Sequence, residues 1–138
     1  MAVHFINPKH TERFREAINS DPEFKLSARQ LTEDALLEVG DSQCIVKIRD
    51  GVITQIKVEP TNLNRWGFAI RAPIESWEKL LQPVPPPYYD SLWGGMIRGT
   101  FRLEGDLPFA FAYFLAITRM LDVMRQVQNK IVNERKRK

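Results

Sequence analysis

The chain has 138 residues, 43% of them apolar and 27% charged, which is the composition of one globular domain and excludes a disordered protein. Its net charge is +3, but subtracting the four cations at residues 135–138 leaves −1 for the rest. A body so close to neutral argues against a nucleic-acid-binding domain, which carries a basic stripe on its folded surface.

Three features indicate where the protein works. Its one cysteine, Cys44, cannot form an internal disulfide, which is typical of a reducing compartment. The opening residues MAVHFINPKH lack a basic leader followed by an apolar run, so they do not read as a secretory signal. The uncharged run from Leu107 to Ile117 has 11 residues, about half of what a membrane span needs. We therefore predict a soluble, cytoplasmic protein.

Two helix starts open the chain. Asn7-Pro8 and Asp21-Pro22 each place a capping residue before a proline, which is well tolerated at the first helical position. We predict an N-terminal helical segment over residues 1–30. A strand follows at residues 35–39.

A hairpin around Asp50-Gly51 comes next, and its register depends on the length of the loop. A two-residue loop pairs Val46 with Gln55, whereas a three-residue loop over residues 49–51 pairs Val46 with Thr54 and Cys44 with Ile56. The second register keeps one face apolar, so we predict the three-residue loop.

The second half of the sequence contains another stretch in which apolar residues alternate along a strand. The stretch RWGFAIRA predicts a strand with Trp66, Phe68 and Ile70 on one side. Pro73 then begins a short helix, and four prolines within residues 83–87 predict an irregular passage. A last strand over residues 99–104 leads to Asp106, which caps a long closing helix. This order predicts an α+β fold, an antiparallel sheet covered on one face by helices.

The closing helix is apolar more than halfway round its circumference, through residues Phe109, Phe111, Tyr113, Phe114, Ile117, Met120, Leu121 and Met124. A sheet can cover only one side of such a helix. The other side needs a second layer of protein, a dimer partner or a bound ligand. Methionine suits all three, because it fills irregular space.

Three stretches together resemble the sterol carrier protein (type 2) family: VKIRDGVITQIKVEP, RWGFAIRAPIESWEKLL and GTFRLEGDLPFAFAYFLAITRML. The shared motifs are the D-G turn, the W-x-x-L-L helix and the G-D pair before the last helix. The resemblance implies a five-stranded sheet and an apolar tunnel for sterols, fatty acids, acyl-CoA or phospholipids, with no catalytic residues. This chain departs from the family at PVPPPYYDSLWGG, residues 83–95.

We therefore predict a lipid carrier whose ligand enters between the sheet and the closing helix, with residues 83–95 gating the mouth. Arg71 and Arg102 are candidates for contact with a charged head group. The basic segment 130–138 is predicted to be a mobile tail that touches anionic membranes transiently. The predicted ligand-binding residues are Trp66, Phe68, Ile70, Trp77, Leu81, Trp93, Met96, Phe101, Phe114, Ile117, Leu121 and Met124.

The sequence offers little for catalysis, so we predict no enzyme, cofactor or metal. His4 and His10 lie near an N-terminus expected to be mobile, and neither H-E-x-x-H nor C-x-x-C occurs. The alternative to a carrier is an interaction module that uses the apolar helix to bind a protein partner or to form a homodimer. A small hydrolase or isomerase acting on an acyl substrate ranks third.

Overall fold

The computed structural model describes residues 3–60 and 64–137. Its strands are β1 (Glu33–Val39), β2 (Ser42–Arg49), β3 (Val52–Val58), β4 (Phe68–Ala72) and β5 (Arg102–Gly105). Its helices are η1 (His4–Ile6), α1 (Thr11–Ser20), α2 (Pro22–Ser27), α3 (Ile74–Leu80), α4 (Leu92–Arg98), α5 (Leu107–Ala112) and α6 (Phe114–Lys136). No helix in this part of the chain is both long and apolar enough to cross a membrane.

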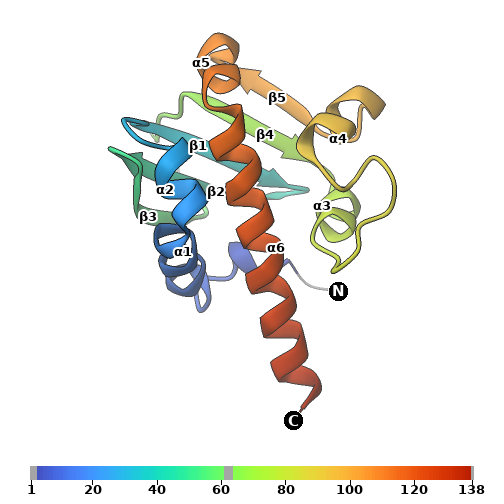
Figure 1. Ribbon diagram of the computed structural model, residues 1–138. Coiled ribbons are helices and arrows are strands. Elements are labelled where there is room, and N and C mark those ends of the chain that lie inside the picture. The colour runs from blue at the N-terminus through green and yellow to red at the C-terminus, as the bar shows by residue number, and fades with distance from the viewer. Residues whose placement is uncertain (1–2, 61–63, 138) are drawn as a thin grey trace.

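The strands form one open sheet in the order β3-β2-β1-β4-β5. Neighbouring strands run antiparallel except β1 and β4, which are parallel. Helices α1, α2 and α6 lie against one face, and α6 crosses the middle of the sheet (Figure 1). The predicted α+β fold with a mainly antiparallel sheet is therefore confirmed.

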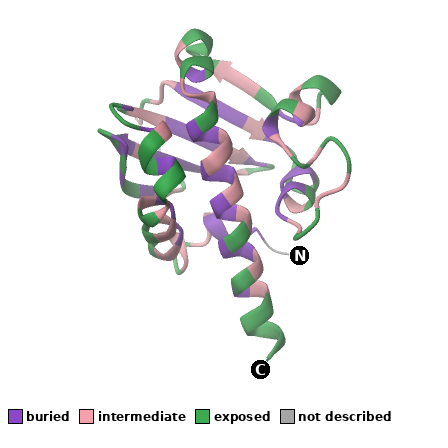
Figure 2. Ribbon diagram, in the orientation of Figure 1, coloured by how far each residue is buried: buried purple, intermediate pink, exposed green. Residues whose placement is uncertain are grey.

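Alternation along the strands divides their side chains between the two faces. In β1, Ala35, Leu37 and Val39 belong to the main core beneath the helices, whereas Leu36 lies in a small cluster on the opposite face. Burial is concentrated where α6 passes over the sheet, and the last turns of α6 are exposed (Figure 2). The space between the sheet and α6, filled by the main core, is called the core layer below.

The register predicted for the hairpin is wrong. Ile48 pairs with Ile53 across a two-residue turn of Asp50 and Gly51, whose φ angles of 50° and 75° suit a type I′ turn. A register shift beside Lys47 then pairs Val46 with Ile56 and not with Gln55. One extra residue in β3 thus keeps the apolar face in register, an outcome that neither simple loop length provides.

The closing helix is two helices and not one. α5 ends at Ala112, and α6 begins at Phe114 after a break at Tyr113. Asp106 caps α5 as predicted, because its carboxylate accepts a hydrogen bond from the N–H of Phe109 at 3.1 Å. The break explains an apolar set wider than half a helical wheel, since two helices with different axes bury different faces.

Three predictions about irregular segments also need correction. The first α-helix begins at Thr11 and not at Pro8, because residues 7–10 form a turn; before that turn lies η1, in which His4 is 2% exposed. Ser91 caps α4, so the end of the proline-rich passage is helical. Residues 130–136, predicted as a mobile tail, are the last turns of α6, and residue 138 lies outside the described residues.

Candidate functional site

Eight of the twelve predicted site residues meet in the core layer. They come from β4, α3 and its C-terminal end, the start of β5 and the middle of α6, and all belong to one buried cluster. The members are Phe68, Ile70, Trp77, Leu81, Phe101, Ile117, Leu121 and Met124.

These side chains fill the layer. Their exposed fractions are 0–2%, and a tunnel wide enough for an acyl chain would leave exposed surface on the side chains that line it. At the centre, the ring of Trp77 lies edge-on to Phe101 at 5.1 Å, and its Nε1 donates to the carbonyl of Glu38 at 2.8 Å. The tunnel implied by the family resemblance is therefore closed by protein along these residues.

Three further predicted residues lie where the layer reaches the surface. Met96 and Phe114 are partly buried and pack against the core, while Trp93 is 54% exposed. The ring of Trp93 meets Phe114 edge-on at 6.3 Å, and Phe111 stacks on Phe114 at 5.8 Å. These contacts join α4 to the α5–α6 break.

Further exposed apolar side chains lie on the same helices, among them Ile97 of α4 at 63% and Leu115 of α6 at 78%. We call this set the α4–α5 surface; its members are Trp93, Met96, Ile97, Leu107, Phe111, Phe114 and Leu115. The sequence interpretation missed Ile97, Leu107 and Leu115. Their spacing in the sequence could have indicated shared helix faces, because Ile97 follows Trp93, and Phe111 follows Leu107, by one helical turn.

Trp66 was placed on the wrong face of the sheet. It precedes β4 and packs against Leu36, Ile45 and Ala69, the small cluster opposite the helices. Trp66 lies before β4, which begins at Phe68, and the intervening Gly67 lies against Glu33: a Cβ atom on Gly67 would meet the end of that side chain at 2.0 Å, so a larger residue would require Glu33 to move. Trp66 does not belong to the core layer.

The two arginines considered for a head group are already paired. Arg71 bonds to both Glu38 and Glu104 at 2.9 Å and lies over the ring of Trp66. Arg102 pairs with Glu104 as well. A cleft of about 430 Å³ at the sheet end, lined by both arginines together with Glu38 and Asp41, lies outside the core layer.

Helix α4 rests directly on the core through Gly95. A Cβ atom there would lie 2.4 Å from the ring of Phe101, and that ring is 2% exposed. The carbonyl of Gly95 also accepts the N–H of Thr100 at 2.9 Å, which holds the end of α4 above β5.

We expect Gly95→Ala to lower the free energy of unfolding by about 1 kcal/mol, because the clash with Phe101 outweighs the gain in helix propensity. Urea denaturation measures this change. Gly94→Ala is the comparison variant, since it gains the same propensity and its Cβ makes a tight but less severe contact of 3.2 Å with the backbone of Tyr88, so it should destabilise less than Gly95→Ala. Equal stability of the two variants would contradict the close packing of Gly95 against the ring of Phe101.

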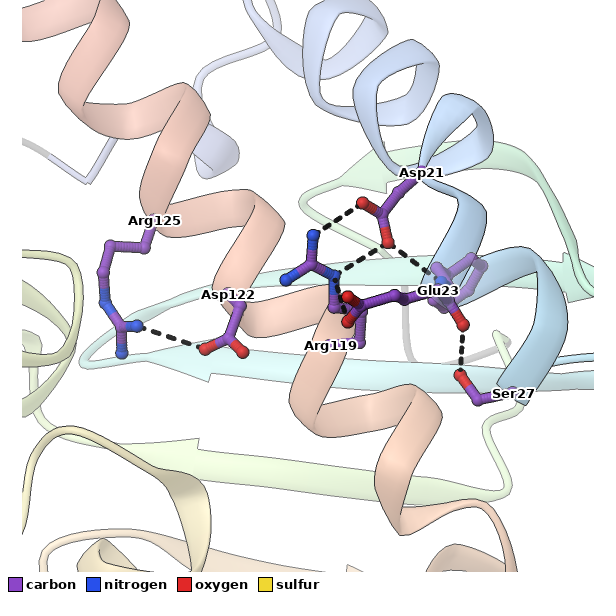
Figure 3. Close-up of polar contacts among 7 residues, drawn as sticks. Asp21, Glu23, Ser27, Arg119, Asp122 and Arg125 are labelled. Carbon is purple, nitrogen blue, oxygen red and sulfur yellow. Dashed lines mark hydrogen bonds and ion pairs between the residues drawn. The ribbon is translucent and has the colours of Figure 1, made fainter.

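Polar contacts hold α6 along most of its length. Arg119 forms two hydrogen bonds with the carboxylate of Asp21 at 2.7 and 2.8 Å, which ties α6 to α2 (Figure 3). On the other side, Arg125 donates to the carbonyl of Leu80 at 2.7 Å. Glu134 pairs with Arg13 of α1 at 2.7 Å.

The beginning of α6 and all of α5 are held differently. Among the described residues, the side-chain hydrogen bonds and ion pairs from α6 to other elements begin at Arg119. Helix α5 lies between a glycine with a positive φ of 98°, Gly105, and the break at Tyr113. Within residues 3–60 and 64–137, no side-chain hydrogen bond or ion pair joins α5 to another element, and its buried Ala110 packs in the main core.

Burial shifts the pKa values of two titratable side chains, Cys44 and His4. Burial raises the pKa of the Cys44 thiol to about 12, with a smaller contribution from Glu59, so the thiol stays protonated and unreactive. Burial also lowers the pKa of His4, aided by Arg135 and His10. In the ranges described, no three His, Cys, Asp or Glu side chains are grouped as metal ligands.

No protein-family model matches the sequence, and no curated protein gives a significant match. Solved structures do resemble it. The crystal structure of sterol carrier protein 2 gives a TM-score of 0.72 at 17% identity, covering 87% of this chain and 96% of that chain. A conserved hypothetical protein from Thermus thermophilus, described as possibly a sterol carrier protein, gives 0.72 at 15% identity and covers 91% of each chain.

A third structure is palmitated sterol carrier protein 2 like 2 from Aedes aegypti. It gives a TM-score of 0.53 at 16% identity and covers 83% of this chain and 95% of that chain. The chain therefore has the fold of sterol carrier protein 2. The family resemblance of the sequence motifs is confirmed at the level of the fold.

Proposed function

We propose that this chain is a non-catalytic, cytoplasmic carrier that binds one hydrophobic ligand with a long acyl chain, such as a fatty acid, an acyl-CoA or a phospholipid, in the core layer. The shared fold supports this proposal, because one solved structure with that fold is described as palmitated. The paired state of Arg71 and Arg102 favours recognition through the apolar chain and not through a head group.

The observation that carries the proposal is the continuity between the α4–α5 surface and the core layer. Phe114 contacts the exposed ring of Trp93 and also packs against the buried cluster. Soluble domains rarely leave a contiguous apolar patch open unless it binds something. An acyl chain that enters beside Phe114 would therefore move from one apolar environment into another.

We place the opening of the packed layer beside α5, where the described side chains make no hydrogen bond or ion pair to another element. Burial of an acyl chain contributes about 0.8 kcal/mol per methylene, which offsets the separation of side chains. Met120 and Met124 line α6 and adapt their shape without strained rotamers. We assign the gate to α5, moving about Gly105 and Tyr113, together with α4, which includes the end of the segment predicted to gate the mouth.

In this proposal the carrier touches the membrane through the α4–α5 surface. The basic end of α6 and the α5 end lie at opposite ends of that helix (Figure 1). With 23 residues, α6 is about 34 Å long, so a bilayer touching the basic end faces away from the mouth. Aromatic and aliphatic side chains such as Trp93 and Leu115 are the types that enter the interfacial region of a bilayer.

Quenching by a fatty acid brominated along its chain tests the proposal, because bromine quenches only the tryptophans that it touches. The three tryptophans are well placed: Trp77 lies in the core layer, Trp93 at its mouth and Trp66 on the far face of the sheet. Single-tryptophan variants separate the signals, with phenylalanine at the other two positions. We expect saturable quenching of Trp77 and Trp93 at one ligand per chain.

Trp66 is the internal control, and its emission should stay constant. Equal quenching of all three tryptophans would indicate nonspecific partition, and no saturable quenching of Trp77 would refute the carrier. Native mass spectrometry of the same samples gives the stoichiometry and the oligomeric state. An unliganded dimer would favour the interaction module.

A further inference from the structure

The core layer has a closed end opposite α5. The short helix η1 contacts β2, α1 and α6 there, so it spans the gap between the sheet and the helices. It lies at the lower end of the sheet, behind α6 (Figure 1). η1 therefore bounds the layer at the end opposite the mouth proposed beside α5.

Phe5 is the side chain that blocks it. The residue has no exposed surface, and its ring lies edge-on to Phe14 of α1 at 6.3 Å and to Trp77 of α3 at 5.3 Å. Together with Phe101 these rings form a continuous aromatic row from α1 to the foot of α4. Phe5 comes from the shortest element of that row.

The backbone of η1 is fixed beside a defined point of α6. The N–H of His4 donates to the side-chain oxygen of Gln128 at 2.9 Å, and the carbonyl of His4 accepts the N–H of Asn7 at 3.1 Å. Gln128 lies 14 positions after Phe114, which is a distance of about 21 Å along α6. The layer therefore has a measurable length between its mouth and Phe5.

We infer that Phe5 is the length stop of this site and sets the longest acyl chain that fits. This inference rests on the proposed function. An extended chain advances about 1.3 Å per methylene, so about 16 methylenes span the distance from Phe114 to Gln128. A longer chain meets the ring of Phe5. This ring is packed between Phe14 and Trp77, so it has no free space into which it could rotate.

Truncation of Phe5 should lengthen the site. Removal of a buried ring leaves an apolar cavity that stays dry and accepts apolar atoms. We expect the preferred chain length to rise by about two to four methylenes in Phe5→Ala, by less in Phe5→Leu, and to fall in Phe5→Trp. Stability should decrease in Phe5→Ala, and Phe5→Leu keeps the test available if that variant does not fold.

The experiment is displacement of a fluorescent fatty acid by saturated fatty acids of increasing length, for the wild type and each Phe5 variant. Ile45→Ala is the control for destabilisation alone, because Ile45 is 1% exposed but belongs to the small cluster on the face of the sheet opposite the core layer. This variant should keep the length preference of the wild type.

The outcomes separate the two proposals. A shift ordered Trp, Phe, Leu, Ala supports the length stop. An unchanged preference in every Phe5 variant overturns it and leaves the carrier in place. Failure of every fatty acid to displace the probe, or of the probe to bind, refutes the carrier and the length stop together.

Discussion

Phe114→Ser is expected to lower the affinity for a fatty acid about ten- to hundredfold while the protein stays folded. Phe114 joins the α4–α5 surface to the core layer, so a chain that takes the proposed entry path passes its ring. The ring is only partly buried, and its loss therefore costs less stability than the loss of a core phenylalanine. Isothermal titration with a fatty acid measures the affinity, and circular dichroism checks the fold.

Leu26→Ser is the matched control, because it removes an apolar side chain that is 65% exposed on α2, away from the mouth. Its affinity should equal that of the wild type. If Phe114→Ser binds as well as this control, the entry path beside Phe114 is wrong. If the same substitution instead converts a dimer into a monomer, the apolar helix serves as an interaction surface.

Asp21→Asn is expected to lower the free energy of unfolding at pH 7 by about 2 kcal/mol. Asn still caps α2, so the change isolates the paired hydrogen bonds to Arg119. Both side chains are largely buried, with exposed fractions of 10% for Asp21 and 25% for Arg119. Asp122→Asn is the control, because its pair with Arg125 lies within one helix and should contribute less than about 0.5 kcal/mol.

The effect of Asp21 should disappear in acid. Hydrogen bonds from Arg119 hold the pKa of this carboxyl below its ordinary value, with help from the N–H of Phe24. Because the folded-state pKa is lower than the unfolded one, the ion pair stabilises the protein above about pH 3.9 and is lost as the pH falls through the folded-state value. Urea unfolding at several pH values should show the wild type and Asp21→Asn converge. A constant difference would contradict the ion pair.

Local signals predicted most of the elements, and they failed where tertiary contacts decide. The caps at Asp21 and Asp106 form as predicted, because a cap is a contact within three residues. The hairpin register was wrong, since the bulge beside Lys47 preserves apolar pairing by a means that counting loop residues does not include. The order of pairing, with β1 between β2 and β4, has no signal in local patterns.

In the candidate site, too, the sequence predicted what local patterns decide and failed where tertiary contacts decide. Alternation correctly placed Phe68 and Ile70 in the core layer, but it misplaced Trp66, because β4 begins only at Phe68. A helical wheel indicated an overly apolar closing segment without revealing the break at Tyr113 that resolves it. Phe5 was not considered, because a segment of three helical residues has no periodicity to detect.

The position of β1 at the centre of the sheet has a consequence for how the chain reaches its native state. β1, β2 and β3 form a local antiparallel meander that is complete at Val58, whereas the parallel partner β4 and the covering helix α6 come later. During synthesis α1 and α2, which precede the meander, can cover only part of its apolar face, and the rest stays uncovered until α6, which begins at Phe114, has emerged. We therefore expect slow final docking of α6, and aggregation of fragments that end before it.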